Sequence, residues 1–261
     1  MPERPGSRLS AGPYRLLLLL LGMAGWAFPA ASLATGSWEL AGQATLRGGL
    51  NTVSGDSLFR PVTGRDFTDG SAEIRLMPQW QVSPGNRFLL HYEAVVRKSP
   101  LPELSGGLPL PLAGGLPGDR TRLLRLTRVL DGQGEWRSWH RLDRLAWRYS
   151  KDWGSLTVGR SALTWGNGLV FNPLDLFNPF APTDVERDYK LGDDLLHVLF
   201  HPAAWNGGME WQLLAVPRRN PVDESVEAAS SSLALKVHRF MGPLEADALL
   251  ALHYDEPVVG L

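Results

Sequence analysis

Long segments in which apolar and polar residues alternate are the feature that most constrains the fold of this chain. In the first of them, Trp38, Leu40 and Leu46 share one parity, while Gln43 and Thr45 share the other. Further segments of this kind cover residues 72–82, 88–96, 209–215, 233–237 and 244–254. A period of two is the signature of a β-strand. Several segments have about 9–12 residues, which exceeds the 5–6 typical of globular sheets and is close to the 9–11 that cross a bilayer.

The connections between these segments alternate in length. Short turns are expected at residues 83–86, 151–154 and 241–243, and long polar or Pro/Gly-rich loops at residues 53–70, 99–120, 161–192 and 217–229. Short turns on one side and long loops on the other are typical of outer-membrane barrels. The sequence therefore predicts an all-β fold, an antiparallel transmembrane β-barrel with long extracellular loops.

Aromatic residues lie near the ends of several predicted strands, where rings with a polar edge can sit at the level of lipid headgroups. They are Trp38, Trp80, Trp147, Tyr149, Trp153, Trp205, Trp211 and Tyr254. The alternative is that the ten Trp residues fill the core of a soluble β-sandwich. In that fold they would be expected in the middle of strands, and few are.

The first residues resemble a secretory signal peptide. Arg4, Arg8 and Arg15 precede an apolar run from Leu16 to Ala30, and small residues follow up to Ala34. The run of about 15 residues is short for a membrane-spanning helix, which needs about 20. We expect residues 1–34 to be a signal peptide cleaved near Ala34 and residues 35–261 to form the barrel in the outer membrane. An uncleaved anchor is the alternative.

Composition excludes several classes of function. Cysteine is absent, so there is no disulfide framework, no thiolate metal site and no cysteine for lipid attachment. Loss of residues 1–34 would remove three Arg and one Glu, which changes the formal net charge from −1 to −3. A chain with this balance is not expected to bind nucleic acid. Beyond Ala34 no apolar run is long enough for a spanning helix, so a membrane would have to be crossed by strands.

One segment is ambiguous between helix and strand. Arg137, Arg141, Arg144 and Arg148 recur at spacings of four, three and four, which fits an amphipathic helix as well as a strand. We favour a strand over residues 142–150, because apolar and polar residues alternate there and a turn follows at residues 151–154.

Two short motifs suggest an enzyme. Gly55-Asp56-Ser57-Leu58 matches the first motif of the GDSL esterases, and Asp194 and His197 have the spacing with which such hydrolases activate a serine. That family has an α/β/α fold, however, and this chain shows almost no helical periodicity. We therefore expect no catalytic residues, and the esterase remains a remote alternative.

Metal binding also has little support in the sequence. Acidic residues in the run from Asp184 to Asp194 could bind Ca²⁺, but Arg187 and Lys190 within the run would repel a cation. The six His residues are scattered. We expect no metal and no cofactor.

Charged residues in the middle of the chain are the candidates for a pore. The candidate pore-lining residues are Arg144, Arg148, Arg160, Asp184, Glu186, Arg187 and Asp188. Arginines facing an acidic loop across a lumen would create a transverse field that selects solutes by charge. The alternative is that the arginines lie above the membrane and bind lipopolysaccharide phosphates or solvent.

Between Thr157 and Asp194 the chain has a strand, a Trp-Gly turn, an Asn-Pro-x-Asp loop and a charged end over residues 186–194. In this pattern it resembles a porin-like family of outer-membrane barrels of Gram-negative bacteria, similar to alginate-export and capsule-assembly barrels. The loop motif comprises Trp165, Gly166, Asn172, Pro173 and Asp175. The resemblance implies an antiparallel barrel with a role in passive transport or envelope assembly. From the alternation and the asymmetry of the loops we expect diffusion of small polar solutes through a lumen narrowed by a loop, in contact with outer-membrane lipid and lipopolysaccharide. A non-conducting barrel for envelope assembly or polysaccharide binding is the alternative.

Barrels of this kind end on a strand with a terminal aromatic residue, whereas this chain ends at Gly260-Leu261. We count nine or ten strands, which suggests a chain truncated at its C-terminus. The free first and last strands would pair with each other in a small barrel or with further strands. Assembly into a homo-oligomer is a further alternative.

Overall fold

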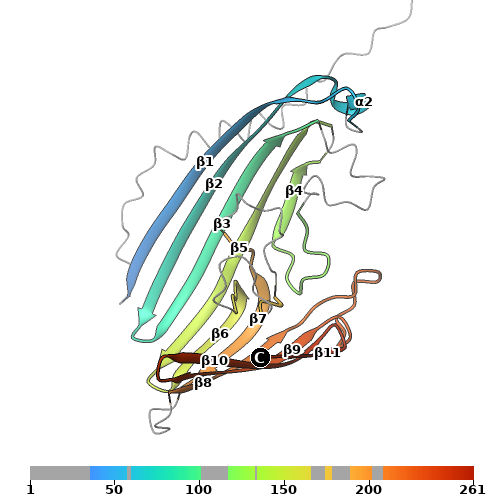
Figure 1. Ribbon diagram of the computed structural model, residues 1–261. Coiled ribbons are helices and arrows are strands. Elements are labelled where there is room, and N and C mark those ends of the chain that lie inside the picture. Colours follow the sequence, from blue (N-terminus) through green and yellow to red (C-terminus); the bar gives the residue numbers. More distant parts are fainter. Residues whose placement is uncertain are drawn as a thin grey trace, which may run out of the picture.

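The computed structural model describes residues 36–57, 60–100, 117–132, 134–165, 174–177, 189–201 and 208–261. In this part of the chain an antiparallel sheet of eleven strands forms one continuous bent wall (Figure 1). The expected all-β antiparallel fold is confirmed, with more strands than the nine or ten predicted. The sheet is open, because β1 and β11 lie at its two ends and are not paired with each other.

The strands follow one another along the sheet almost without interruption. The first five are β1 (Ser37–Thr52), β2 (Asp66–Ser83), β3 (Asn86–Lys98), β4 (Thr127–Asp131) and β5 (Trp136–Lys151). The other six are β6 (Gly154–Ser161), β7 (Asp193–Phe200), β8 (Met209–Val216), β9 (Ser232–Met241), β10 (Leu244–His253) and β11 (Glu256–Gly260). A four-residue helix, α2 (Arg60–Thr63), lies between β1 and β2. Among the described residues no helix is long and apolar enough to span a membrane.

Strand β4 is the exception to the sequential order. It pairs with the first half of β5, whereas β6 pairs with the second half, so β4 and β6 occupy the same side of β5 one after the other. Between them, residues 142–144 of β5 have no strand partner on that side. Gaps of this kind are where loops can enter a sheet.

The long connections lie on one edge of the sheet. Since consecutive strands are antiparallel, residues 53–65, 162–192 and 217–231 all leave from the same edge, which we call the long-loop edge. The tight turns after β2, β5 and β9 lie on the opposite, short-turn edge. The alternation of short and long connections predicted from the sequence is thus present. The turn between β10 and β11 departs from it, being short on the long-loop edge.

One face of the sheet, the apolar face, carries large exposed hydrophobic side chains. Register places Val158 of β6 opposite Leu196 of β7, and Leu250 of β10 opposite Val259 of β11. The exposed members include Leu40, Leu46, Leu50, Leu90, Leu145, Val158, Leu196, Leu213, Leu233, Leu250, Leu252 and Val259. So broad an exposed apolar surface marks a face that contacts something other than water.

Aromatic rings form a row on the apolar face at the short-turn edge. Trp38, Trp80, Phe88 and Trp147 are register partners across β1, β2, β3 and β5. The rings of Trp38 and Trp80 stack at 5.2 Å, and those of Trp80 and Phe88 at 5.9 Å. The predicted placement of aromatic residues at strand ends holds for these three tryptophans. Trp205, also predicted, lies outside the described residues.

The other face, the site face, is polar on the N-terminal strands, and on the C-terminal strands it carries both an apolar cluster and polar residues. Two side chains of the loop after β6, Trp165 and Phe177, pack there on buried residues of β8 and β10. The cluster comprises Trp165, Phe177, Leu195, Leu214, Val216, Ala234, Leu249 and Ala251. The described parts of this loop are therefore held against the site face.

Candidate functional site

The candidate site is built around a β-bulge in β5. Leu142 and Arg144 pair with the consecutive residues Tyr92 and His91 of β3, so Asp143 is an extra residue in β5. In a regular strand, residues three apart point to opposite faces. The extra residue brings Arg144 back to the face that Arg141 shares.

The bulge explains the ambiguous arginine spacing. Arg137 and Arg141 share the site face on one side of the bulge, and Arg144 and Arg148 share it on the other. The segment is a strand, as favoured, and the amphipathic-helix alternative is wrong. The spacing of three among spacings of four arises because one extra residue is inserted in the strand.

Five buried charged residues on the site face form what we call the inner charge cluster. They are Arg75, Glu93, Arg141, Asp143 and Arg144. Arg75, Glu93 and Arg141 are register partners on β2, β3 and β5. Glu93 accepts a 2.7 Å hydrogen bond from Nη2 of Arg75 and forms an ion pair with Arg141. The cluster holds three cations and two anions, and each acid contacts an arginine. Buried charges require such a partner.

The end of the loop after β6 packs directly on this cluster. The guanidinium of Arg75 lies over the ring of Tyr189, with 3.7 Å between Cζ of Arg75 and the ring centroid. Cζ of Arg144 lies 4.6 Å from the same centroid. Arg144 also donates to the backbone oxygen of Lys190, and the Gly192 amide donates to Oδ1 of Asp143 at 3.3 Å. The loop thus binds the site face at the unpaired part of β5.

Tyr189 remains a neutral phenol at physiological pH. Burial is the main cause that raises the pKa of its hydroxyl, to about 12, against the opposing effect of Arg144. The same hydroxyl contacts Nδ1 of His91 on β3. A neutral ring with an electron-rich face stacked on guanidinium groups is a cation–π arrangement.

A second buried ion pair holds the loop together internally. Nζ of Lys190 lies 2.6 and 2.7 Å from the two carboxylate oxygens of Asp175. Asp175 also accepts from the backbone amide of Trp165, and the indole Nε1 of Trp165 donates to Gln212 of β8 at 2.6 Å. Two of the predicted loop-motif residues, Trp165 and Asp175, therefore anchor the loop.

Another charged cluster lies at the long-loop edge, where β6 ends. Nε of Arg160 donates to Asp194, and Nη1 of Arg160 donates to Asp119, each at 2.9 Å. Asp119 in turn accepts from Arg122. Burial by itself would raise the pKa of the Asp119 carboxyl, but Arg160 and the hydrogen bond from Arg122 outweigh burial and lower this pKa. Residues 117–126 are thereby tied to the ends of β6 and β7.

The predicted pore-lining arginines have different surroundings. Arg144 and Arg160 are buried in ion pairs, so their charges are compensated inside the protein. Arg148 is exposed on the site face and donates to Thr157 at 3.2 Å. The other predicted pore-lining residues, Asp184, Glu186, Arg187 and Asp188, and the motif residues Gly166, Asn172 and Pro173, lie outside the described residues.

Sequence reasoning missed four residues of the site: Arg75, Glu93, Asp143 and Tyr189. Arg75 and Glu93 were recognised only as the polar parity of their strands. Their pairing depends on which strands are neighbours, a fact that alternation does not contain.

A polar hollow of about 840 Å³ lies beside the inner charge cluster. Its wall includes Arg75, Glu93 and Arg141, and Tyr189 closes part of it from the loop side. Polar side chains of β1 and β2, such as Gln43 and Glu73, also line it, together with a few apolar side chains such as Val95. The hollow gives the site face room for water and small polar molecules.

Two residues of the esterase motifs, Asp194 and His197, have partners of their own, and Leu58 of the first motif lies outside the described residues. Asp194 binds Arg160 and the Leu124 amide, whereas Nε2 of His197 contacts Gln212 at 3.0 Å. Asp194 and His197 are three apart on β7, which directs them to opposite faces. Such an arrangement does not let an aspartate orient a histidine beside a serine.

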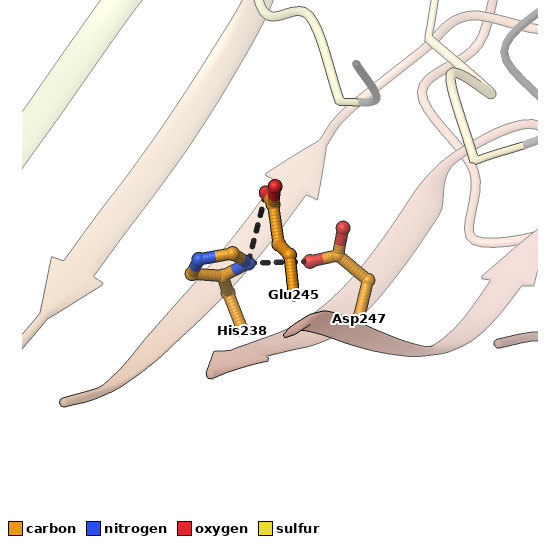
Figure 2. Close-up of side chains that lie close together, drawn as sticks. All are labelled: His238, Glu245 and Asp247. Atoms are coloured by element: carbon orange, nitrogen blue, oxygen red, sulfur yellow. Dashed lines mark hydrogen bonds and ion pairs between the residues drawn. The ribbon is translucent and has the colours of Figure 1, made fainter. Parts of the chain in front are cut away.

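One group of possible metal ligands exists in the described part of the chain. His238 of β9 and Glu245 and Asp247 of β10 place one nitrogen and two carboxylate oxygens within 4.8 Å of one another. They face one another across the hairpin (Figure 2). Sequence reasoning passed over these residues, because they become neighbours only when β9 pairs with β10.

Comparison of the chain with protein-family models, with curated proteins and with solved structures found no match.

Proposed function

We propose that this chain forms the wall of an outer-membrane β-barrel in which the loop after β6 narrows a passage for small polar solutes. The observation that carries the proposal is the contrast between the two faces of one sheet. The apolar face is lined with exposed Leu, Val and Trp side chains, while the site face carries the inner charge cluster and the polar hollow. A sheet that separates hydrocarbon from a water-filled lumen needs this division.

The lengths and edges of the sheet support the same proposal. β1, β2, β3 and β5 have 16, 18, 13 and 16 residues, enough to cross a bilayer at a steep tilt. The aromatic row at the short-turn edge corresponds to a headgroup-level belt. In a membrane the backbone groups on the free edges of β1 and β11 must have hydrogen-bond partners. Pairing of the two edges with each other, with further strands or with a second copy would supply these partners.

The loop supplies the constriction in this proposal. Tyr189 stacks on Arg75 of the wall, and the buried Lys190–Asp175 pair stiffens the loop behind it. Other arginines on the site face are neighbours in register without an acidic partner among the described residues, namely Arg97 with Arg137 and Arg87 with Arg148. Uncompensated charges of one sign along a passage select solutes by charge.

Planar-bilayer recording of the full chain, folded in detergent, tests this function. The expected result is discrete conductance steps that are absent from detergent alone. Tyr189→Ala should give larger steps than the native chain, because it removes the ring that closes the hollow. Absence of steps from protein that is folded and inserted would contradict the proposal.

A second function is a non-conducting barrel that binds polysaccharide or an envelope partner. The observation in its favour is the apolar packing of Trp165 and Phe177 on the site face, which fills the space over β8 and β10. The same recording separates the two functions, since a plugged barrel gives no steps either as the native chain or as Tyr189→Ala. Binding of soluble polysaccharide by the folded chain would then support the second.

A further inference from the structure

The hairpin of β9 and β10 presents three metal-ligating side chains from two adjacent strands. Nδ1 of His238 lies 3.0 Å from Oδ1 of Asp247 and 3.7 Å from Oε1 of Glu245. His238 and Asp247 are register partners, and Glu245 precedes Asp247 by two residues, so all three point to the site face. Figure 2 shows the imidazole directed at both carboxylates.

From these residues we propose a binding site for a divalent transition-metal ion, for which Zn²⁺ is the natural probe. Imidazole nitrogen and carboxylate oxygen are both zinc ligands, at about 2.0–2.2 Å from the ion. Two ligands at that distance from one ion lie roughly 3.0–3.5 Å apart in octahedral or tetrahedral arrangements. Of the two separations from Nδ1 of His238, 3.0 Å lies in this range and 3.7 Å is slightly longer.

The surroundings of the cluster hold its ligands in place. The ring of His238 packs edge-to-face on Phe240, with 4.7 Å between the centroids. The side chains of His238 and Asp247 are each 14% exposed and that of Glu245 is 41% exposed. Two ligands are thus fixed by packing, and the third lies on the open side from which an ion would enter.

A lysine already places positive charge against the cluster. Nζ of Lys236 lies 3.0 Å from the same Oδ1 of Asp247 that faces His238. Two carboxylates and one ammonium leave the cluster with a net negative charge when His238 is neutral. A bound divalent ion would take over the contact that Lys236 makes, so the lysine competes with the metal. Its removal should therefore strengthen metal binding.

Zinc titration of the full chain, folded in detergent and freed of metal with a chelator, tests the proposal. We expect saturable binding of one Zn²⁺ per chain. His238→Gln and Asp247→Asn should each weaken binding at least about tenfold, since even loss of an outer-shell partner costs 10–100-fold. His201→Gln, which alters an exposed histidine after β7, is the matched control and should bind as the native chain does.

Lys236→Met provides the discriminating variant. A metal site predicts that this variant binds Zn²⁺ more tightly than the native chain, whereas a hydrogen-bonded cluster without metal affinity predicts no binding by either. Circular dichroism of each variant checks that the sheet is retained. The proposal is overturned if the native chain does not bind Zn²⁺ saturably, or if His238→Gln binds it as well as His201→Gln. Both outcomes are independent of whether the chain conducts.

Discussion

The guanidinium of Arg75 lies 3.7 Å from the centroid of the Tyr189 ring, joining the second strand of the wall to the end of the loop after β6. Arg144 approaches the same ring at 4.6 Å. The contact is thus shared by two strands of the sheet and one loop residue. It fixes the position of the loop over the polar hollow.

Tyr189→Ala should release the loop from the wall. Cation–π contacts contribute about 0.5–2 kcal/mol each, so we expect a lower free energy of unfolding in urea. Tyr189→Phe retains the ring and is the matched control, losing only the contacts of the hydroxyl with His91 and Arg75. Equal losses in the two variants would show that the hydroxyl, and not the stacking, holds the loop.

Breaking the buried pair of Asp175 and Lys190 should destabilise the protein strongly. Both side chains are less than 10% exposed, and leaving one charge unpaired at such a site costs about 3–5 kcal/mol. Asp175→Asn and Lys190→Met should each show this loss in urea unfolding. The double variant should recover much of it, because it buries no unpaired charge. Additive losses would mean that the two residues act independently.

Gly192→Ala should be poorly tolerated. A Cβ at Gly192 would lie 2.3 Å from the backbone oxygen of Asp143 and 2.9 Å from Nη1 of Arg144. Such overpacking typically costs about 1–3 kcal/mol. Gly48→Ala is the matched control, since a Cβ there meets nothing within 4 Å. Thermal unfolding of the two variants compares them, and equal midpoints would contradict the close approach of the loop to the bulge.

Asp119 should make the attachment of residues 117–126 dependent on pH. The pKa of its carboxyl is lowered in the folded protein, so its stabilising effect is fully present above 3.8, its ordinary value, and is lost as the pH falls through the lower folded value. Asp119→Asn should be less stable than the native chain at neutral pH, and the difference should shrink in acid. Hydrogen exchange of residues 117–126, followed from pH 7 to pH 3, measures this difference in stability. A difference that grew in acid would contradict the expected direction of the pH dependence.

Neighbouring residues on β1 test which face meets lipid. Leu46 lies on the apolar face and is 84% exposed, and Thr45 beside it points to the site face. If the apolar face contacts hydrocarbon, Leu46→Arg should cost up to about 2–4 kcal/mol in vesicles, and Thr45→Arg much less. In a water-soluble sheet neither change would matter, and equal unfolding of the two variants in vesicles would count against the membrane proposal.

Much of the fold could be predicted from the alternation of residue types. The period of two located most of the long strands, and the tight turns at residues 83–86 and 241–243 gave the antiparallel hairpins. Strands β4 and β7 and the short β11 were not predicted. β4 has only five residues, too few for a clear pattern, and its place beside β5 comes from pairing with residues that follow it.

The candidate site could be predicted only in part. Trp165, Asp175, Arg144 and Arg160 were chosen from the sequence, and the structure gives each an anchoring or charge-pairing role. Arg144 and Arg160, which were predicted to line a pore, are both buried. Burial of an arginine depends on what packs over it, here residues 189–192 and 117–126, which are distant in sequence.

The sequence by itself determined that this chain forms strands with one apolar and one polar face, because the side-chain period of a strand is a local property of the backbone. The tertiary structure alone decided that Arg75, Glu93 and Arg141 share one row, that Asp143 bulges, and that Tyr189 stacks on the row. Register, bulges and loop contacts depend on pairing between distant segments, and a shift of one residue in the pairing of a strand would turn all the side chains of that strand to the other face.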